Sequence, residues 1–454
     1  MGLDGNKILG RLKRLSETER FKDIKPLSYA LFPGYHCPLM GAMLTINNIR
    51  ESVMLVLGPD ECAYYTKMAT GGNGAMSAQG CRIVSVVLGQ HDVTFGCQET
   101  LTEAFEELAR EYQPKAVFLV ATCVPEVTGD DVESLCQRME ERYGFPIMVV
   151  HAENFRTDDH LPGIERTLEA SFKLMRSQAT DGSVNILGLR LGDFRRTEVC
   201  TLLREAGVPL GMILPGQSSV EEITEAPKAA VNLVVHPVGL PLAERMKDAF
   251  GTPYVVFERY SDPERIRDCY RSLFSALGKP VPGTVEEKCR EAIARTAKAR
   301  EALQGGSYFS GNTALANWEF HGFLAERLGM KGLLIQTSKF DERDLPYKET
   351  ILHTADPYLS RAANLGALKY LYPILRPDYN IGAGNPREMA ETGTTPVTMP
   401  RAYNTLGFEV TEMVTDAFLA ARSRRAGSGG PQGMSGIPMG MGGVAGQGSQ
   451  EVRK

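Results

Sequence analysis

The sequence lacks the motifs by which many enzymes bind nucleotides or catalytic metal ions. No G-x-G-x-x-G follows the first strand of any predicted domain, and no G-x-x-x-x-G-K-[ST], H-E-x-x-H or C-x-x-C occurs in the 454 residues. We therefore do not expect ATP or NAD to bind through these motifs. If the protein carries out redox chemistry, its energy source and some of its ligands must come from another molecule.

Long apolar runs and a one-sided charge are also missing. No stretch of about 18 apolar residues is available to span a membrane, and the charged N-terminal segment contains no apolar run resembling a signal peptide. The net charge of −5 comes without a basic stripe that would match nucleic-acid phosphates. We expect a cytoplasmic protein with neither a nucleic-acid nor a membrane partner.

Nine cysteines are present, and in a reducing compartment they are expected to remain thiols rather than to form a disulfide framework. Four of them lie in stretches predicted to be amphipathic helices and are expected to serve packing alone: Cys136, Cys200, Cys269 and Cys289. Cys81 and Cys97 are intermediate cases. The remaining three, Cys37, Cys62 and Cys123, stand apart because each is predicted to lie where a strand or loop meets a helix.

Short apolar strands alternate with helices along the chain, in three groups. The first group covers 52–58, 82–89, 116–123 and 146–152, and the second covers 184–190, 209–216, 231–237 and 254–258. The third covers 306–312, 332–338, 349–354, 379–384 and 395–399. Strands that are apolar on both faces and alternate with helices are typical of parallel sheets. The pattern predicts an α/β fold with three Rossmann-like, doubly wound parallel-sheet domains around a shared cleft.

Breaks in this pattern give the predicted domain boundaries. The three Rossmann-like domains are expected at 31–178, 179–283 and 284–426, the last including a C-terminal helix. Residues 1–30 are expected to form a helical arm whose apolar stripe packs either on its own chain or on a partner: Ile8, Leu9, Leu12 and Leu15. The Gly/Met-rich residues 427–454 are too poor in bulky side chains to build a core and are expected to be disordered.

Three cysteines are predicted to converge at one edge of the first sheet. Cys62 lies just after the strand at 52–58, Cys123 closes the next strand but one, and Cys37 precedes the helix that leads to the first strand. Parallel strands end at the same edge, where open α/β sheets bind ligands, and nearby helix N-termini favour thiolates. A [4Fe–4S] cluster usually takes four thiolates, so a non-cysteine ligand or a second chain would have to complete such a site. The alternative is three unrelated buried cysteines.

Several segments resemble a known family. Four of them are similar, in order, to the cysteine motifs of nitrogenase component 1 subunits: CPLMGA (37–42), GPDECAYY (58–65), VTFGCQETLTEAFEEL (93–108) and TCVPEVTGDDVESL (122–135). Two further segments resemble the β-type subunit in particular: PGQSSVEEITEAPKAAVNLVV (215–235) and YNTLGFEV (403–410). The resemblance covers most of residues 30–420.

The resemblance implies that Cys37, Cys62 and Cys123 are thiolate ligands of an iron–sulfur cluster, of [8Fe–7S]-like or [4Fe–4S] type. An α-type partner subunit would supply the remaining ligands, within an α2β2 heterotetramer. A separate homodimeric, ATP-hydrolysing iron protein would pass electrons through this cluster to an active site mainly in the α-type partner. The missing P-loop agrees with that division of labour. The Gly-Asp-Asp run at 129–131 would start the helix that follows Cys123.

Four further residues have alternative interpretations. Tyr64 and Tyr65 either lie close to the cluster or pack as ordinary aromatic residues. His236 follows a strand of the second domain, at a loop where α-type subunits carry a cofactor-binding cysteine, and is either structural or in contact with a cofactor or substrate. Cys97 stands where the family often has glycine, which favours packing over ligation.

The resemblance leaves the reaction open. The chain is shorter than a nitrogenase β subunit, which favours a nitrogenase-like reductase, and three cysteines on one chain favour a methylthio-alkane reductase that cleaves carbon–sulfur bonds. The alternatives within the family are a nitrogenase β subunit, a tetrapyrrole reductase of the protochlorophyllide or nickel-sirohydrochlorin type, and a non-catalytic metal-cofactor assembly scaffold. Outside the family, the alternative is a Rossmann-type transferase without a metal, and such a protein would be colourless when purified.

Overall fold

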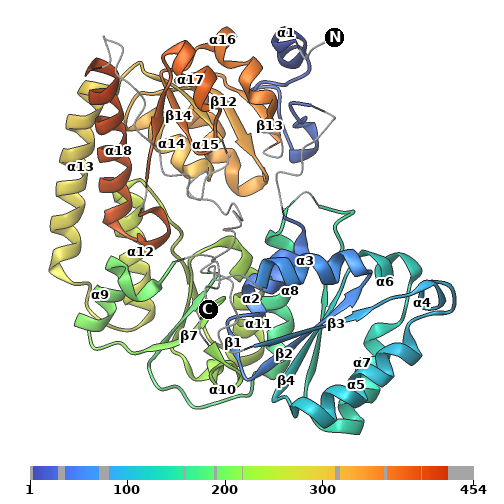
Figure 1. Ribbon diagram of the computed structural model, residues 1–454. Helices are drawn as coiled ribbons and strands as arrows, with labels where there is room; N and C mark the ends of the chain where they lie inside the picture. Colours follow the sequence, from blue (N-terminus) through green and yellow to red (C-terminus); the bar gives the residue numbers. More distant parts are fainter. Residues whose placement is uncertain are drawn as a thin grey trace, which may run out of the picture.

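Parallel β-sheet forms the framework of three consecutive parts of the chain (Figure 1). The computed structural model describes residues 4–28, 36–70, 81–157, 159–188, 192–216, 218–311, 317–361, 366–399 and 401–427. Its three main sheets have four, four and five strands, and the neighbouring strands in each run parallel. The predicted α/β fold with three parallel sheets is confirmed. The residue boundaries given above for the domains stay a prediction.

The first sheet, with strand order β3-β2-β4-β5, carries the three candidate cysteines at one edge. Its strands are β2 (Ser52–Gly58), β3 (Arg82–Val87), β4 (Ala116–Ala121) and β5 (Ile147–His151). The two central strands, β2 and β4, are buried at every position, as expected of strands with helices on both faces. Those helices are α2 (Pro38–Ile46), α3 (Asp60–Thr70), α4 (Gln90–Phe95), α5 (Gln98–Tyr112), α6 (Cys123–Thr128), α7 (Val132–Tyr143) and α8 (Leu161–Ser171).

The second sheet has the order β10-β9-β6-β7. Its strands are β6 (Val184–Leu187), β7 (Leu210–Leu214), β9 (Val231–Val234) and β10 (Tyr254–Val256). The accompanying helices are α9 (Glu198–Glu205), α10 (Val220–Thr224), α11 (Leu240–Phe250) and α12 (Pro263–Ala276). A short parallel pair, β1 (Ile49–Arg50) with β8 (Ser218–Ser219), links the first part of the chain to the second.

The third sheet has the order β13-β12-β11-β14-β15. Its strands are β11 (Ser307–Ser310), β12 (Lys331–Thr337), β13 (Tyr358–Arg361), β14 (Tyr379–Ile381) and β15 (Thr395–Val397). The helices are α13 (Gly283–Leu303), α14 (Trp318–Glu326), α15 (Leu345–Leu352), α16 (Tyr372–Leu375), α17 (Pro386–Thr392) and α18 (Phe408–Gly427). The two longest, α13 and α18, pack side by side (Figure 1). No helix in the described part of the chain has both the length and the apolar character needed to cross a membrane.

One predicted strand is wrong. Residues 349–352 of the predicted strand 349–354 belong to helix α15 and the last two form a turn, and the strand of this region is β13, a few residues later. Pro346 stands in the first turn of the helix, where its missing N–H costs nothing, and Ile351 is the one buried residue of α15. A single inward-facing residue leaves little periodicity, so the short apolar run was misleading.

The N-terminal segment packs on the third sheet of its own chain. Helix α1 (Gly5–Leu9) is shorter than predicted, because the helix ends at Gly10 and the chain continues extended to form an antiparallel bridge from Arg14 to Tyr358. Ile8 and Leu12 are buried in one apolar cluster with residues of the third part of the chain, and Figure 1 shows α1 beside β13 and α16. This packing favours the first of the two alternatives, and the helical arm at 1–30 with its contact to a partner stays a prediction. Of the tail predicted at 427–454, Gly427 is the last residue of helix α18, and the rest lies outside the described residues.

Two glycines allow helices α2 and α8 to pack closely behind the first sheet. A Cβ atom on Gly163 would lie 1.8 Å from the carbonyl oxygen of Pro38, and one on Gly41 would lie 2.0 Å from the carbonyl oxygen of His160. Neither approach is possible for a residue with a side chain, since the atoms that would collide belong to the backbone. Pro38 directly follows Cys37, so this packing fixes where the first candidate cysteine lies.

We predict that Gly163→Ala displaces helix α2 and destabilises the first part of the chain. Overpacking of this kind costs about 1–3 kcal/mol, and the first thermal transition should shift to lower temperature in calorimetry. Gly283→Ala is the matched control, because an added Cβ there meets nothing within 4 Å. Equal melting of Gly163→Ala and the wild type would contradict the predicted packing role.

Candidate functional site

The three cysteines lie at helix starts on the carboxyl edge of the first sheet. Cys37 is the N-cap residue of α2, and Cys62 lies in the first turn of α3, directly after β2. Cys123 is the first residue of α6, directly after β4. Strands β2 and β4 are adjacent and parallel, so α3 and α6 leave the sheet on the same side. The predicted convergence of the three cysteines at one edge is confirmed.

The thiols are close enough to influence each other electrostatically. Burial raises the pKa of Cys62, and negative charge on Cys37 or Cys123 raises that pKa further. Burial is also the main cause that raises the pKa of Cys37, to which a thiolate at Cys123 adds. Three thiolates at this edge would therefore repel one another unless a positive charge lay among them.

Hydrogen-bond donors surround the sulfur atoms. The backbone N–H of Asn154 donates to Cys123 Sγ at 3.2 Å. The N–H groups of Leu39 and Met40, in the first turn of α2, point at Cys37. The Thr122 hydroxyl donates to the carbonyl oxygen of Leu57 at 2.9 Å, and its side chain lowers the pKa of the neighbouring Cys62 against the effect of burial. Such donors stabilise the thiolate form, which is the form that binds metals.

Exposure separates these cysteines from most of the others. Cys37, Cys62 and Cys123 are half-buried, as is Cys269 of α12, whereas the other five are buried. Cys97, one of these five, is 1% exposed and belongs to an apolar cluster of the first sheet, as expected for packing. In the described part of the chain, no group of three or more His, Cys, Asp or Glu side chains is gathered tightly enough to hold a single metal ion.

The Gly-Asp-Asp run fixes the turn between α6 and α7. Gly129 ends α6 in the left-handed conformation, with φ of +77°. Asp130 accepts a hydrogen bond from the backbone N–H of Cys97 at 3.0 Å, which ties the turn to the loop before α5. Asp131 is the N-cap of α7 and accepts from the N–H of Ser134. The run thus starts the helix that follows the Cys123 turn, as predicted.

The two tyrosines after Cys62 differ. The hydroxyl of Tyr65 lies 2.6 Å from His36 Nδ1, and the ring packs against the core beside Cys62. Burial, followed by negative charge on Cys37, raises the pKa of Tyr65. Tyr64 is 63% exposed on the same helix. Only Tyr65 therefore lies beside the thiols, and Tyr64 faces outward.

An apolar rim surrounds the cysteine edge. Of eleven large hydrophobic residues exposed in the described part of the chain, seven lie at the carboxyl end of the first sheet: Tyr64, Met68, Val87, Val93, Phe95, Val127 and Phe155. They come from the end of β3, from helices α3, α4 and α6, and from the loop after β5. Exposed apolar patches of this kind mark interaction surfaces.

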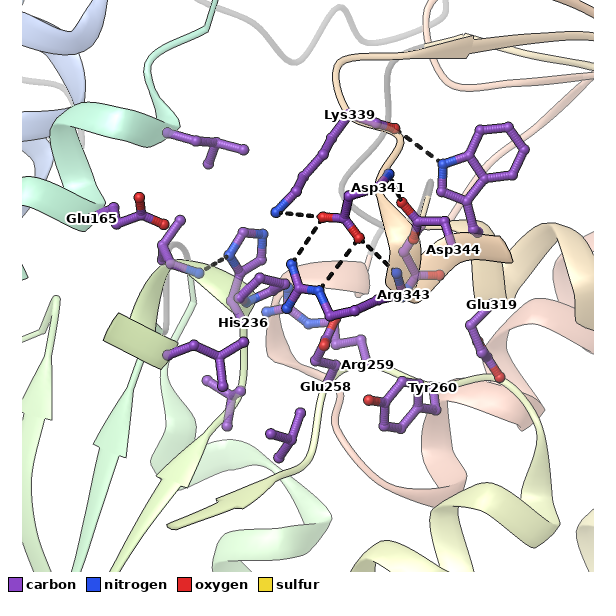
Figure 2. Close-up of a pocket in the computed structure, with 18 of the residues that line it drawn as sticks. Glu165, His236, Glu258, Arg259, Tyr260, Glu319, Lys339, Asp341, Arg343 and Asp344 are labelled. Atoms are coloured by element: carbon purple, nitrogen blue, oxygen red, sulfur yellow. Dashed lines mark hydrogen bonds and ion pairs between the residues drawn. The ribbon is translucent and has the colours of Figure 1, made fainter. Parts of the chain in front are cut away.

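A cavity of about 1420 Å³ lies where the three parts of the chain meet (Figure 2). Glu165 of α8 lines it from the first part and His236 and Glu258 from the second, with Lys339 and Arg343 from the third. His236 Nδ1 accepts a hydrogen bond from the N–H of Val238, so this histidine caps the short helical turn that follows it. Its predicted contact with a cofactor or substrate stays a prediction. A cleft shared by the three domains is predicted from the sequence, but no periodic or motif signal identifies its lining residues, because they come from three distant segments.

The cavity offers more acceptors than donors. Lys339 and Arg343 both pair with Asp341, at 3.0 and 3.2 Å. Within the described residues, Glu165 and Glu258 have neither a hydrogen-bond nor an ion-pair partner for their carboxyl groups. Burial raises the pKa of both.

We predict that Glu258→Gln stabilises the protein at neutral and alkaline pH. Because burial raises the pKa of Glu258, the folded chain binds this proton more tightly than the unfolded chain does, and stability falls as pH rises through the raised pKa. The neutral amide escapes this penalty, so the gain in melting temperature should be larger at pH 8 than at pH 5. The exposed Glu244→Gln is the control. An equal gain in melting temperature at both pH values would contradict a raised pKa of Glu258 in the folded chain.

Comparison with known proteins gives one family. The family model "Nitrogenase component 1 type Oxidoreductase" matches residues 37–409. Among solved structures, "Nitrogenase Cp1 at pH 6.5" superposes with a TM-score of 0.73 over 89% of this chain and 96% of that one, at 15% sequence identity. At such low identity the superposition speaks for the fold alone.

Three curated relatives align with this chain at sequence identities from 24% to 31%. The nitrogenase iron-molybdenum cofactor biosynthesis protein NifE of Clostridium pasteurianum is 31% identical over 261 residues, which are 56% of this chain and 55% of that protein. NifE of Nostoc sp. is 26% identical over 77% of this chain and 74% of its own length. The nitrogenase molybdenum-iron protein alpha chain of Methanosarcina barkeri is 24% identical over 65% and 58%. The β-type assignment therefore stays a prediction.

The family match spans all three sheets and begins at Cys37, the first of the three converging thiols. The chain belongs to the nitrogenase component 1-type oxidoreductase family.

Proposed function

We propose that this chain is one subunit of a heteromeric, nitrogenase-like complex and holds one side of an iron–sulfur cluster through Cys37, Cys62 and Cys123. The observation that carries the proposal is the gathering of three half-buried thiols at one sheet edge, with backbone N–H donors directed at the sulfur atoms of Cys37 and Cys123. Family membership supports it, since the matched segment begins at the first of these residues.

The donor set fits a cluster better than a single ion. In an iron–sulfur cluster each thiolate binds a different iron atom, so the sulfurs surround a body wider than one ion. That requirement agrees with three thiols that influence each other's pKa without forming a single-ion site in the described residues. The iron would also supply the positive charge that offsets repulsion among the thiolates. When bound, the cluster supplies one-electron transfer.

The apolar rim supports a second subunit at this edge. Aromatic and aliphatic side chains gather around the thiols, and burial of such a rim against a partner would exclude water from the cluster. The partner would contribute the remaining ligands, which explains why three thiols suffice on this chain. In the nitrogenase-like scheme, an ATP-hydrolysing iron protein delivers the electrons and the α-type partner carries most of the active site.

Two roles remain for such a complex. Reductive cleavage of methylthio-alkanes is the role favoured by the sequence, with a nitrogenase β subunit or a tetrapyrrole reductase as related alternatives. A role in assembling a metal cofactor is favoured by a specific observation: two of the three curated relatives described above are named cofactor biosynthesis proteins. In both roles the cysteine edge holds the shared cluster.

Replacing Cys62 by Ala should remove the cluster without unfolding the chain. Because Cys62 lies in a helix next to solvent rather than deep in the core, the variant should keep its circular dichroism spectrum while the co-purified, anaerobic complex loses iron and its visible absorption. Cys269→Ala is the matched control, since Cys269 is also half-buried but lies on α12. Unchanged iron content in Cys62→Ala would remove this residue from the ligand set.

Charge on the apolar rim should weaken assembly. Phe95 is 76% exposed beside the cysteine edge, and Phe95→Glu should lower the affinity for the partner subunit at least tenfold, which corresponds to about 1.4 kcal/mol. Ile293→Glu is the control, because Ile293 is exposed on α13, away from this edge. Equal affinity of both variants in analytical ultracentrifugation would contradict a partner at the rim.

The two roles predict different outcomes in one reconstitution. The anaerobic complex is mixed with an iron protein, ATP and dimethyl sulfide, and in parallel with a nitrogenase component 1 that lacks its cofactor. Release of methanethiol in the first mixture supports the reductase. Activation of the nitrogenase in the second, without methanethiol release in the first, supports the assembly role.

A further inference from the structure

The short helix that begins at Cys123 has little apolar anchorage. Helix α6 has six residues: Pro125 is buried, Val124 is partly buried against the apolar cluster of the first sheet, and Val127 is 72% exposed. A helix of this length is not stable by itself, because nucleation is costly and few internal hydrogen bonds form. Two apolar contacts leave much of the orientation of α6, and with it the direction of the Cys123 thiol, to polar contacts.

His151 supplies the main contact of this kind. It is the last residue of β5, the strand next to β4. Its ring nitrogen Nδ1 hydrogen-bonds to Glu126 of α6, and its Nε2 lies 3.0 Å from Glu133 Oε1 of α7. One imidazole thus joins the helix that carries Cys123 to the helix that follows it.

The geometry requires a charged imidazole. Ionised carboxylates only accept hydrogen bonds, so both ring nitrogens of His151 must donate, which only the imidazolium can do. Burial opposes this charge, but the hydrogen bonds to Glu126 and Glu133 outweigh burial and raise the pKa of His151. Since both nitrogens are occupied, His151 is not available as a general base for a thiol.

The strand end that carries His151 is itself held firmly. Arg166 of α8 donates through Nη1 to the backbone oxygen of His151 and to Glu153 Oε2, each at 2.7 Å. The side chain of Glu153 is 2% exposed and that of Arg166 is 30% exposed, so the pair is partly buried. Three residues after His151, the N–H of Asn154 donates to Cys123 Sγ. The same rigid segment therefore contacts α6 at the sulfur and again one turn later, at Glu126.

We propose that His151 is a positioning residue for Cys123: bridged between Glu126 and Glu133, it clamps α6 against α7 and fixes the direction of the Cys123 thiol. The two bridges are unequal, because the Glu126 side chain is 17% exposed and that of Glu133 is 65% exposed. The bond to Glu126 is therefore the stronger, since solvent screens it less. The benefit of orienting Cys123 as a cluster ligand rests on the proposed function. The contacts of His151 with Glu126 and Glu133, in contrast, belong to the metal-free chain.

The clamp is tested by the reactivity of Cys123 in the full-length, metal-free chain. Iodoacetamide labelling of each cysteine is followed by mass spectrometry. His151→Ala and Glu126→Ala should raise the labelling rate of Cys123 at least threefold, while the rate at Cys37 stays unchanged as an internal reference. Glu126→Gln should stay within twofold of the wild type, because the amide oxygen still accepts from His151 Nδ1–H.

Two controls make the result specific. Glu133→Ala should have a smaller effect than Glu126→Ala, and Glu141→Ala, at an exposed position of the same helix α7, should have none. A Cys123 rate that is unchanged in both His151→Ala and Glu126→Ala overturns the proposal. An equal rise at Cys37 and Cys123 also overturns it, because that would indicate general loosening.

A spectroscopic measurement on the assembled complex separates this proposal from the proposed function. If the wild-type complex binds iron, His151→Ala should change the visible circular dichroism of the cluster while Glu141→Ala leaves it unchanged. A complex without iron would contradict the proposed function, yet the labelling rates would still decide the clamp. Iron-loaded His151→Ala with a wild-type spectrum would overturn the positioning role.

Discussion

The structure depends on one constraint, the common direction of the strands in a parallel sheet. Every strand of the first sheet delivers its following residue to the same edge, so residues far apart in sequence meet there without a dedicated motif. Cys62 follows β2, Cys123 follows β4, and Asn154 follows β5. Cys37 reaches the same edge because the close packing of α2 on α8 brings its N-terminus there.

The same constraint explains why the edge is both polar and apolar. Helix starts place N–H groups near the sulfur atoms, and the short helices α4 and α6 expose apolar side chains such as Phe95 and Val127. A donor-rich centre inside an apolar rim suits a charged inorganic group that is covered by another protein. The interdomain cavity has the opposite character, with carboxyl groups of Glu165 and Glu258 that lack partners among the described residues. None of Cys37, Cys62 and Cys123 lines this cavity, so it is separate from the cysteine edge.

Much of the fold could be predicted because buried parallel strands leave a strong signal. Strands such as β2 and β4 are continuous apolar runs followed by glycine or cysteine turns, and the segments predicted there are strands. The exception at 349–354 arose because α15 buries only Ile351 and so lacks a helical repeat. The N-terminal stripe was misread in length because the helix ends at Leu9, and Leu12 and Leu15 are buried in the irregular segment that follows it.

The site could be predicted only in part. The positions of Cys37, Cys62 and Cys123 followed from strand order, but the contacts that orient them did not. His151 and Glu126 are 25 residues apart, and no local pattern signals that a histidine at a strand end will meet a glutamate after the neighbouring strand. Partner-supplied ligands leave no trace in this sequence either, beyond an apolar rim that is dispersed over five segments.

The most direct test is an anomalous-scattering map, recorded at the X-ray absorption edge of iron, from crystals of the complex purified anaerobically. The account predicts iron peaks at the carboxyl edge of the first sheet, in bonding contact with the sulfur atoms of Cys37, Cys62 and Cys123 and with ligands from a second chain. Iron bound elsewhere on this chain, with these three thiols unligated, would contradict it.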